Sequence, residues 1–506
     1  MVDRAISGDG TALRASFAIW RDRLVAIVTV LLVVATVIHL IFPILTLGSL
    51  AERNFNEGWN VYHALRAAQG EVMYDANPWR VNNYPFVSFY LIAWLDWFVG
   101  DLLFTGRLVA ILSLAVTAVS GGVVVRCLGG RALEAVVTAF AIPAFFHLTA
   151  AAWTGADDPQ TLGHAFMMVG LAVYVADRRS FKHLGAAALL FALGGFTKHN
   201  LVPIPLAVSL DILIMSRRYF AVWCVFSFGA LAIMVVATEV LAGGDFLGHL
   251  LTARVYLWDH IGYHTRKFLI AFKLPMLVAL VLLFRPLPPG QGVLLRAYGV
   301  IAWTSALYFA GGDGTSFNIF LDCAIFLAIM SGLAIGQVRQ WKPGRWPAAL
   351  AVLIVPVLAF YPVFSRLPGP VEQLIHFSRT MDGVRLFNTF FSESRQYLAG
   401  KSGLAVCENL MVCWRAGKPF VLDTFNERQQ VLAGGLDEEP FLKRIRAREF
   451  SVIQTSAPIE SETPGELNEN LTRMNRFTDN FLRTVLENYR LDTNAPSGLY
   501  IFYVPR

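Results

Sequence analysis

The sequence predicts a polytopic α-helical membrane protein with about eleven transmembrane helices and a small α/β domain at its C-terminal end. Hydrophobic residues make up 56% of the 506 residues and charged residues only 15%, against about 25% in a typical soluble domain. Apolar runs long enough to cross a bilayer follow one another from residue 24 to residue 364. Residues 369–506 differ, because they hold 33 of the 78 charged residues (42 basic plus 36 acidic).

This composition excludes several classes of protein. A charged content of 15% rules out an ordinary soluble enzyme, and 12 Trp, 15 Tyr and 38 Phe rule out a disordered or collagen-like chain. The net charge of +6 is modest, and no basic tract is interleaved with aromatic residues, so we expect no nucleic-acid partner. Lys and Arg in excess are typical of the cytoplasmic loops of membrane proteins.

The first apolar run, Leu24–Leu47, follows a basic N-terminal segment, residues 1–23. The run is longer than the apolar region of a signal peptide and lacks a small-residue cleavage site, so we expect a retained anchor with a cytoplasmic N-terminus. The transmembrane domain is expected over residues 24–368, with its first outer loop over 48–106. The other predicted spans lie near 107–125, 134–153, 160–177, 184–197, 201–216, 219–241, 268–284, 297–310, 317–336 and 347–364.

The stretch Pro85–Phe104 is ambiguous, because it is rich in aromatic residues but contains Asp96 and Asp101. If it spans the membrane, Arg178 and Arg179 fall outside; if it lies along the outer interface, they fall inside with most other basic loop residues. Aromatic amphipathic helices are stable at that interface. We therefore predict interfacial helices in the first outer loop, about eleven spans and a periplasmic domain over 369–506.

This topology gathers polar residues at the outer ends of the spans. They are Glu57, Asp157, Asp158, Lys198, His199, His260, His264, Asp313, Asn318 and Asp322. Ionisable residues at membrane depth are costly and usually functional, so the set predicts a reaction chamber that opens outward. Each residue also has a simpler interpretation. Glu57 could be a solvated loop acid, Lys198 could extend to the interface, and Asp158-Pro159 could cap a helix.

The order of the motifs indicates a family. Asn56-Glu57-Gly58 opens the first outer loop, and Tyr84-Pro85-Phe86, Asp157-Asp158, Thr197-Lys198 and a Gly-rich segment with Asn318 and Asp322 follow. This series resembles the integral-membrane glycosyltransferases of the C-type fold, which include protein O-mannosyltransferases and the aminoarabinose transferase acting on lipid A. The sequence departs from the family at Asn56, where a second carboxylate is common.

The resemblance implies an inverting hexosyl- or pentosyltransferase at the outer face of a bacterial inner membrane. Its donor would be a sugar on a polyprenyl phosphate, and its acceptor a hydroxyl of a glycolipid, lipopolysaccharide or polysaccharide. Glu57 is the first choice for the general base, with Asp157 and Asp158 as alternatives. Lys198 is the first choice for stabilising the departing phosphate. Further donor or substrate contacts are assigned to Arg80, His199, Tyr84, His260, His264, Asn318 and Asp322.

Two other classes of function stay open. A secondary transporter or lipid flippase also places polar residues at membrane depth, although no internal repeat is visible here. An inactive scaffold of the same fold is the second alternative. A cofactor is not predicted: His260 and His264 have metal-ligand spacing but no third ligand nearby, and some members of the family use a divalent cation whereas others do not. The residues identify neither the sugar, the prenyl carrier nor the acceptor.

The C-terminal domain alternates strand-like and helix-like segments. Strands are predicted over Leu404–Glu408, Pro419–Asp423, Phe450–Thr455 and Leu499–Val504, helices over Glu438–Arg448 and Leu467–Arg490, and a linker over Ser461–Glu469. Cys407 and Cys413 lie six residues apart, so a disulfide could form in an oxidising compartment. Packing over the chamber or control of acceptor access is the expected role of this domain.

Overall fold

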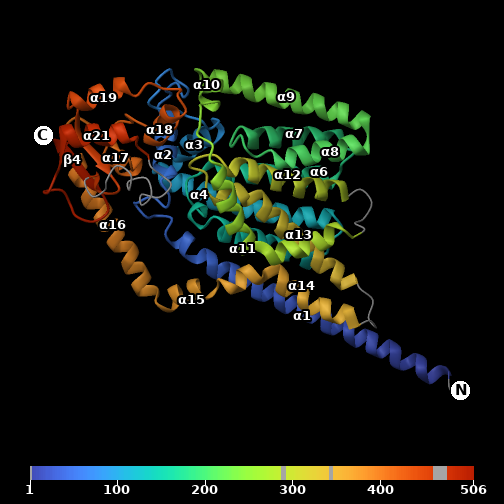
Figure 1. Ribbon diagram of the computed structural model, residues 1–506. Helices are drawn as coiled ribbons and strands as arrows, with labels where there is room; N and C mark the ends of the chain where they lie inside the picture. The colour runs from blue at the N-terminus through green and yellow to red at the C-terminus, as the bar shows by residue number, and fades with distance from the viewer. Residues whose placement is uncertain (1–2, 286–291, 341–345, 460–475) are drawn as a thin grey trace.

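The computed structural model describes residues 3–285, 292–340, 346–459 and 476–506. A helical bundle forms one part of the molecule and a small α/β domain forms the other, at the end of the bundle opposite the N-terminus (Figure 1). Every stretch that was predicted to cross the membrane contains a helix. These helices are α1 Asp3–Leu45, α4 Leu102–Cys127, α5 Ala132–Thr149, α6 Pro159–Ala176, α7 Phe181–Gly195, α8 Pro203–Met215, α9 Arg217–Leu241, α11 Trp258–Leu283, α12 Gly292–Ala310, α13 Leu321–Gln340 and α14 Trp346–Ser365.

Six helices in the described ranges are long and apolar enough to cross a membrane, and a seventh span is counted if the bent pair Ala351–Ser365 and Pro368–Ile375 is taken as one. The protein is therefore a multi-pass membrane protein, and the count of eleven spans stays a prediction. Helices α7 and α8 are apolar but have 15 and 13 residues, which gives lengths of about 20 Å at 1.5 Å per residue.

The first outer loop contains two short helices, α2 Asn56–Ala68 and α3 Val87–Val99. Helix α3 is separate from α4, because Gly100 has a positive φ of 81° and Asp101 begins α4 by accepting a hydrogen bond from the Phe104 amide at 3.0 Å. Thirteen residues extend only about 20 Å, less than the hydrocarbon thickness of roughly 30 Å. Trp97 on α3 is 82% exposed, as expected for an aromatic helix in the interface.

An ion-pair network joins three helices at the end of the bundle that lies away from the α/β domain. Arg339 of α13 contacts Glu134 of α5 at 2.8 Å and Asp22 of α1 at 3.3 Å. The N-terminal part of α1 and the basic ends of other helices therefore meet on one side. The positive-inside rule predicts that this side faces the cytoplasm, and the orientation stays a prediction.

The α/β domain is reached through α15 Pro368–Ile375 and α16 Phe377–Ala399. Its four strands have the order β1-β2-β4-β3, with β1 parallel to β2 and the other pairs antiparallel. The strands are β1 Leu404–Cys407, β2 Phe450–Thr455, β3 Tyr489–Leu491 and β4 Ile501–Pro505. The domain's helices are α17 Leu410–Arg415, α18 Thr424–Leu432, α19 Glu439–Arg446 and α21 Asp479–Asn488. Short segments η1 Ala151–Trp153, α10 Phe246–Leu250 and η2 Phe317–Phe320 complete the outer loops of the bundle.

One prediction for this domain is wrong. Pro419–Asp423 forms no strand, because the Asp423 amide donates to the Trp79 carbonyl at 2.7 Å and the Asp423 side chain caps α18. Of the predicted helix Leu467–Arg490, residues 467–475 lie outside the described residues; helix α21 is capped by the Thr478 hydroxyl, and Tyr489 and Arg490 belong to β3. The predicted linker Ser461–Glu469 lies outside the described residues.

Membrane-impermeant maleimide labelling of intact cells tests the orientation. The exposed residues Arg179 and Lys443 are each replaced by Cys, and the native, exposed Cys127 serves as the inner reference. We expect the Lys443→Cys protein to be labelled in intact cells. Cys127 and the cysteine of the Arg179→Cys protein should be labelled only after the membrane is permeabilised. Labelling of Arg179→Cys in intact cells would reverse the assigned sidedness.

Candidate functional site

A completely buried ion pair fixes the start of the first outer loop. Glu57 lies in the first turn of α2 and is 0% exposed, as is Arg107 of α4. The guanidinium binds both carboxylate oxygens, with Nε to Oε1 at 2.8 Å and Nη2 to Oε2 at 2.7 Å. Such a bidentate pair is short and geometrically specific, and it brings α2 onto the outer end of α4.

The same carboxylate also accepts two backbone hydrogen bonds. The Arg53 amide donates to Oε2 at 2.7 Å and the Asp157 amide donates to Oε1 at 2.8 Å. Four donors thus occupy the four acceptor positions of a carboxylate. Glu57 is held rigidly and directs the α5–α6 loop, which carries Asp157 and Asp158, toward α2.

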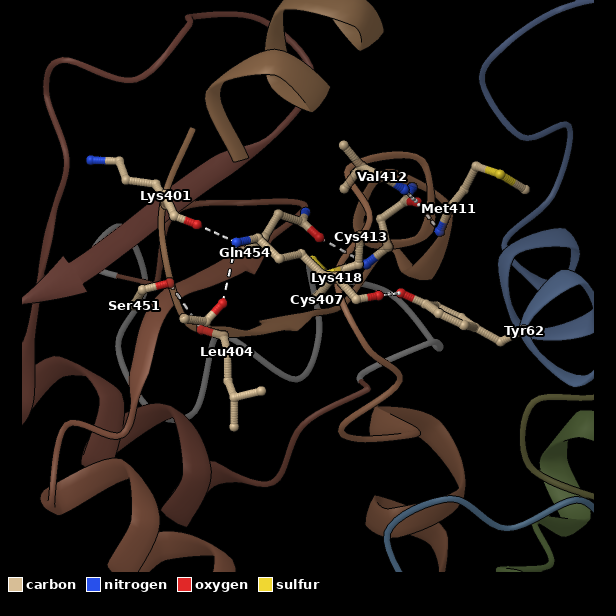
Figure 2. The surroundings of a disulfide bond; sticks show 12 residues. Tyr62, Lys401, Leu404, Cys407, Met411, Val412, Cys413, Lys418, Ser451 and Gln454 are labelled. Carbon is tan, nitrogen blue, oxygen red and sulfur yellow. Dashed lines mark hydrogen bonds between the residues drawn. A yellow bond between two sulfur atoms is a disulfide. The ribbon is translucent and has the colours of Figure 1, made fainter. Parts of the chain in front are cut away.

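Gly58 allows the α/β domain to pack closely against α2, next to the Glu57–Arg107 pair. A Cβ atom at position 58 would collide with the backbone of Met411 in α17. Figure 2 shows the segment that docks here, which is closed by a disulfide between Cys407 and Cys413, and the Tyr62 hydroxyl of α2 donates to the Lys418 carbonyl at 2.7 Å. The disulfide joins the end of β1 to α17, and it orders the turn that packs on α2.

The two acids of the α5–α6 loop have different surroundings. Both carboxylate oxygens of Asp157 are buried without a hydrogen-bond partner, and burial, followed by the nearby Glu57 and Asp158 charges, raises its pKa well above the ordinary value. Asp158 caps α6 by accepting from the Gln160 amide at 2.8 Å, as its sequence predicts. Its carboxylate also lies 3.6 Å from Lys198 Nζ, and Asn56 donates to it at 3.4 Å.

Lys198 is buried between an acid and an aromatic ring. It follows α7, and its Nζ lies 3.7 Å from the centre of the Tyr84 ring. Burial disfavours the charged ammonium, but Asp158 and then Tyr84 outweigh that effect and raise the pKa of Lys198. The raised pKa favours the charged form of Lys198, whose ion-pair partner is Asp158.

Two cavities of opposite character border the segment Asn83–Pro85. An apolar groove of about 630 Å³ lies among α7, α8, α9 and α10, and Pro85, Phe196 and His199 line the groove. A polar pocket of about 60 Å³ is lined by Asn56, Trp59, Asn83 and Tyr84 from the first outer loop. Lys198 contacts this segment through the Tyr84 ring. We call Asn83–Pro85 with Lys198 the divider.

Several predicted site residues lie elsewhere or have other partners. Arg80 pairs with Asp75 at 2.9 Å, and His199 lines the apolar groove. His260 and His264 lie in the first turns of α11 with their rings 5.9 Å apart. Within the described ranges, no group of three metal-ligating side chains is present.

Asn318 and Asp322 are four residues apart but belong to two different helical segments. Asn318 belongs to the 3-10 segment η2, which has three residues per turn, and α13 begins only at Leu321. Asp322 is buried, accepts from the Tyr298 hydroxyl at 3.3 Å and lies 3.4 Å from His164 Nε2. This cluster connects α6, α12 and α13 inside the bundle.

Sequence analysis missed a second set of site residues. Arg254 precedes α11, Asp423 and Asn426 belong to the start of α18, and Arg476 precedes α21, yet all four line the polar pocket. Their segments carry no local motif, so only the packing of the α/β domain on the bundle brings them to Trp59 and Tyr84. A weak signal was present, because the domain was expected to pack over the chamber.

Replacing Glu57 by Ala should destabilise the protein strongly, because it leaves the Arg107 charge buried and unpaired. Breaking one partner of a buried pair costs about 3–5 kcal/mol. Thermal unfolding of the purified protein in detergent measures the loss, with the exposed Glu393→Ala protein as the matched control. The double variant Glu57→Leu/Arg107→Met should recover part of the stability; equal stability of Glu57→Ala and wild type would refute the anchoring role.

Replacing both Cys407 and Cys413 by Ser should lower the stability of the α/β domain by about 2 kcal/mol, the loop-entropy value for a ring this small. Thermal unfolding with and without reductant provides the measurement. The reductant should lower the transition temperature of the wild-type protein but not that of the double Ser variant. A wild-type transition that is insensitive to reductant would contradict this role of the disulfide.

Comparison with solved structures identifies the fold of this protein. No family model matches the sequence, and no curated protein matches it. Among solved structures, ArnT from Cupriavidus metallidurans bound to undecaprenyl phosphate is similar, with a TM-score of 0.54, 12% identity and coverage of 96% of this chain and 97% of that one. The Archaeoglobus fulgidus oligosaccharyltransferase in the apo form has a TM-score of 0.56 and 10% identity over 93% of this chain and 73% of that one. This protein therefore has the C-type fold of the integral-membrane glycosyltransferases.

Proposed function

We propose that the protein is a glycosyltransferase that moves a sugar from a polyprenyl-phosphate donor to an acceptor hydroxyl at the outer face of the cytoplasmic membrane. The C-type fold supports a membrane glycosyltransferase, and one of the similar structures was solved with undecaprenyl phosphate bound. A glycolipid, lipopolysaccharide or polysaccharide is the proposed acceptor. The N-terminus, which follows the positive-inside rule if it is cytoplasmic, and the α/β domain lie at opposite ends of the bundle (Figure 1), which supports a periplasmic position for the domain and the site.

The position of the divider between the two cavities is the main support for this proposal. A lipid-linked sugar has an apolar tail, an anionic phosphate and a polar sugar in that order. The apolar groove, Lys198 and the polar pocket occur in the same order, because Pro85 lines the groove, Tyr84 contacts Lys198 and Asn83 lines the pocket. A buried cation at such a boundary is costly unless it meets an anion, and Asp158 at 3.6 Å supplies only part of that compensation.

The chemistry that this arrangement supports is a single displacement. The acceptor oxygen forms a bond to the anomeric carbon, and the bond between that carbon and the phosphate oxygen breaks, so the configuration inverts. The acceptor hydroxyl proton passes to the Asp158 carboxylate. The electron pair leaves on the phosphate, whose charge Lys198 and Arg254 stabilise.

Asp158 is a better candidate for the base than Glu57, which was the first choice from sequence. All four acceptor positions of Glu57 are occupied. Asp158 has three partners, the Gln160 amide, Lys198 and Asn56, and Asn56 lines the polar pocket. Glu57 is then a positioning residue that holds the Asp157 amide.

Asp158→Asn and Lys198→Met variants test the proposal. Each should lower transfer at least a hundredfold, because general-base and electrostatic contributions are each worth roughly 10²–10³ in rate. Activity is measured as the missing sugar in glycolipid mass spectra of a deletion strain complemented with each variant. Protein levels in the membrane are measured in parallel.

Matched controls use exposed residues of the same type. Asp259→Asn and Lys443→Met should retain wild-type glycolipids. Wild-type glycolipids in the Asp158→Asn strain would refute the assigned base. A deletion strain that keeps every glycolipid sugar, but accumulates a lipid-linked precursor on the inner leaflet, would instead identify a flippase.

A further inference from the structure

Helix α18 of the α/β domain closes the polar pocket from outside. Its N-terminal residue Asp423 accepts from Trp59 Nε1 of α2 at 2.7 Å, and the Gln429 amide donates to Asp313 at 2.7 Å. Gln429 Oε1 also accepts from the Val255 amide at 3.1 Å, and Arg428 pairs with Asp313 at 3.1 Å. One helix of the soluble domain is therefore tied to three separate outer segments of the bundle.

Phe425 on this helix is part of the pocket wall. Its ring lies against Gly314, where a Cβ atom would collide with the ring. Gly314 has a positive φ of 74°, so both its backbone conformation and this contact require glycine. The Phe425 ring centre is also 6.4 Å from that of Phe55. The wall is thus fixed from two sides.

The remaining lining suits a carbohydrate. Trp59 and Tyr84 offer apolar ring surface, and Asn56, Asn83 and Asn426 offer amide donors and acceptors. The charges in the lining balance, because Arg254 and Arg476 face Glu408 and Asp423. Such a mixture of rings, amides and paired charges complements a ligand with many hydroxyl groups and little net charge.

The volume of the pocket limits the size of that ligand. A space of about 60 Å³ holds roughly four to six water molecules at 10–15 Å³ each. One sugar ring displaces a comparable number of waters, whereas a disaccharide needs room for a second ring. Phe425 of α18 is one of the side chains that bound this space.

We propose that the pocket beneath α18 binds a single, uncharged sugar residue of the donor, and that Phe425 is the specificity-determining residue that excludes longer saccharides. This inference rests on the proposed function, because it assigns the sugar of the same donor. The phosphate lies at Lys198, and the sugar lies between Trp59 and Phe425. The α/β domain therefore selects the substrate although the reacting groups belong to the membrane domain.

Two lipid-linked probes test the size limit. One is the donor extracted from the deletion strain, and the other is the same donor extended enzymatically by one glucose residue at its non-reducing end. Full-length protein in liposomes is given either probe with lipid extract of the deletion strain as the acceptor. Wild type should transfer the first probe at least tenfold faster than the extended one, and Phe425→Ala should raise the extended-to-normal ratio at least tenfold.

A second substitution keeps the test independent of folding defects. Phe425→Trp should lower transfer of the normal donor at least tenfold while leaving the binding of undecaprenyl phosphate unchanged, because the larger ring fills the sugar space only. Phe387→Ala, which removes an exposed ring of α16, should behave as wild type. Equal use of both probes by wild type, or an unchanged ratio in Phe425→Ala, would overturn the size limit alone. An absence of transfer from both probes by wild type would overturn the proposed function as well.

Discussion

The buried pair between Glu57 and Arg107 is the interaction on which the rest of the site depends. Removing two charges from water is expensive, and the cost is offset only when every acceptor and donor position is used. Here the carboxylate takes its four hydrogen bonds from α4, from the start of the first loop and from the α5–α6 loop. Three segments that are distant in sequence are therefore fixed around one group, and each of them positions a different part of the site.

The divider follows from this anchoring. Once α2 is fixed, Trp59 and the segment Asn83–Pro85 lie over the end of α7, and Lys198 is enclosed between Asp158 and the Tyr84 ring. The segment that contacts this cation borders an apolar groove at Pro85 and a polar pocket at Asn83. The arrangement matches the three chemically distinct parts of a lipid-linked sugar. This match is the reason that we propose a lipid-linked sugar as the donor.

Much of this could be predicted from sequence, because hydropathy and positive charge report directly on the membrane. They indicated the helices, the short helix α3 and the common position of Asp158, Lys198 and Tyr84. The role of Glu57 could not be predicted, since its partner Arg107 is 50 residues away and looks like an ordinary helical arginine. Arg254, Asn426 and Arg476 were missed for the same reason: their convergence depends on how α18 packs. Pro419–Asp423 has strand-like composition, but its hydrogen bonds go to Trp79 and to the cap of α18 instead of a sheet.

The affinity of purified protein for undecaprenyl phosphate tests the central claim most directly. Lys198→Met removes the cation of the divider, and Ser227→Trp fills the apolar groove from α9. Both variants should bind at least tenfold more weakly than wild type, a loss of about 1.4 kcal/mol, and Lys443→Met should bind as wild type does. Unchanged affinity in both the Lys198→Met and the Ser227→Trp proteins would contradict the account.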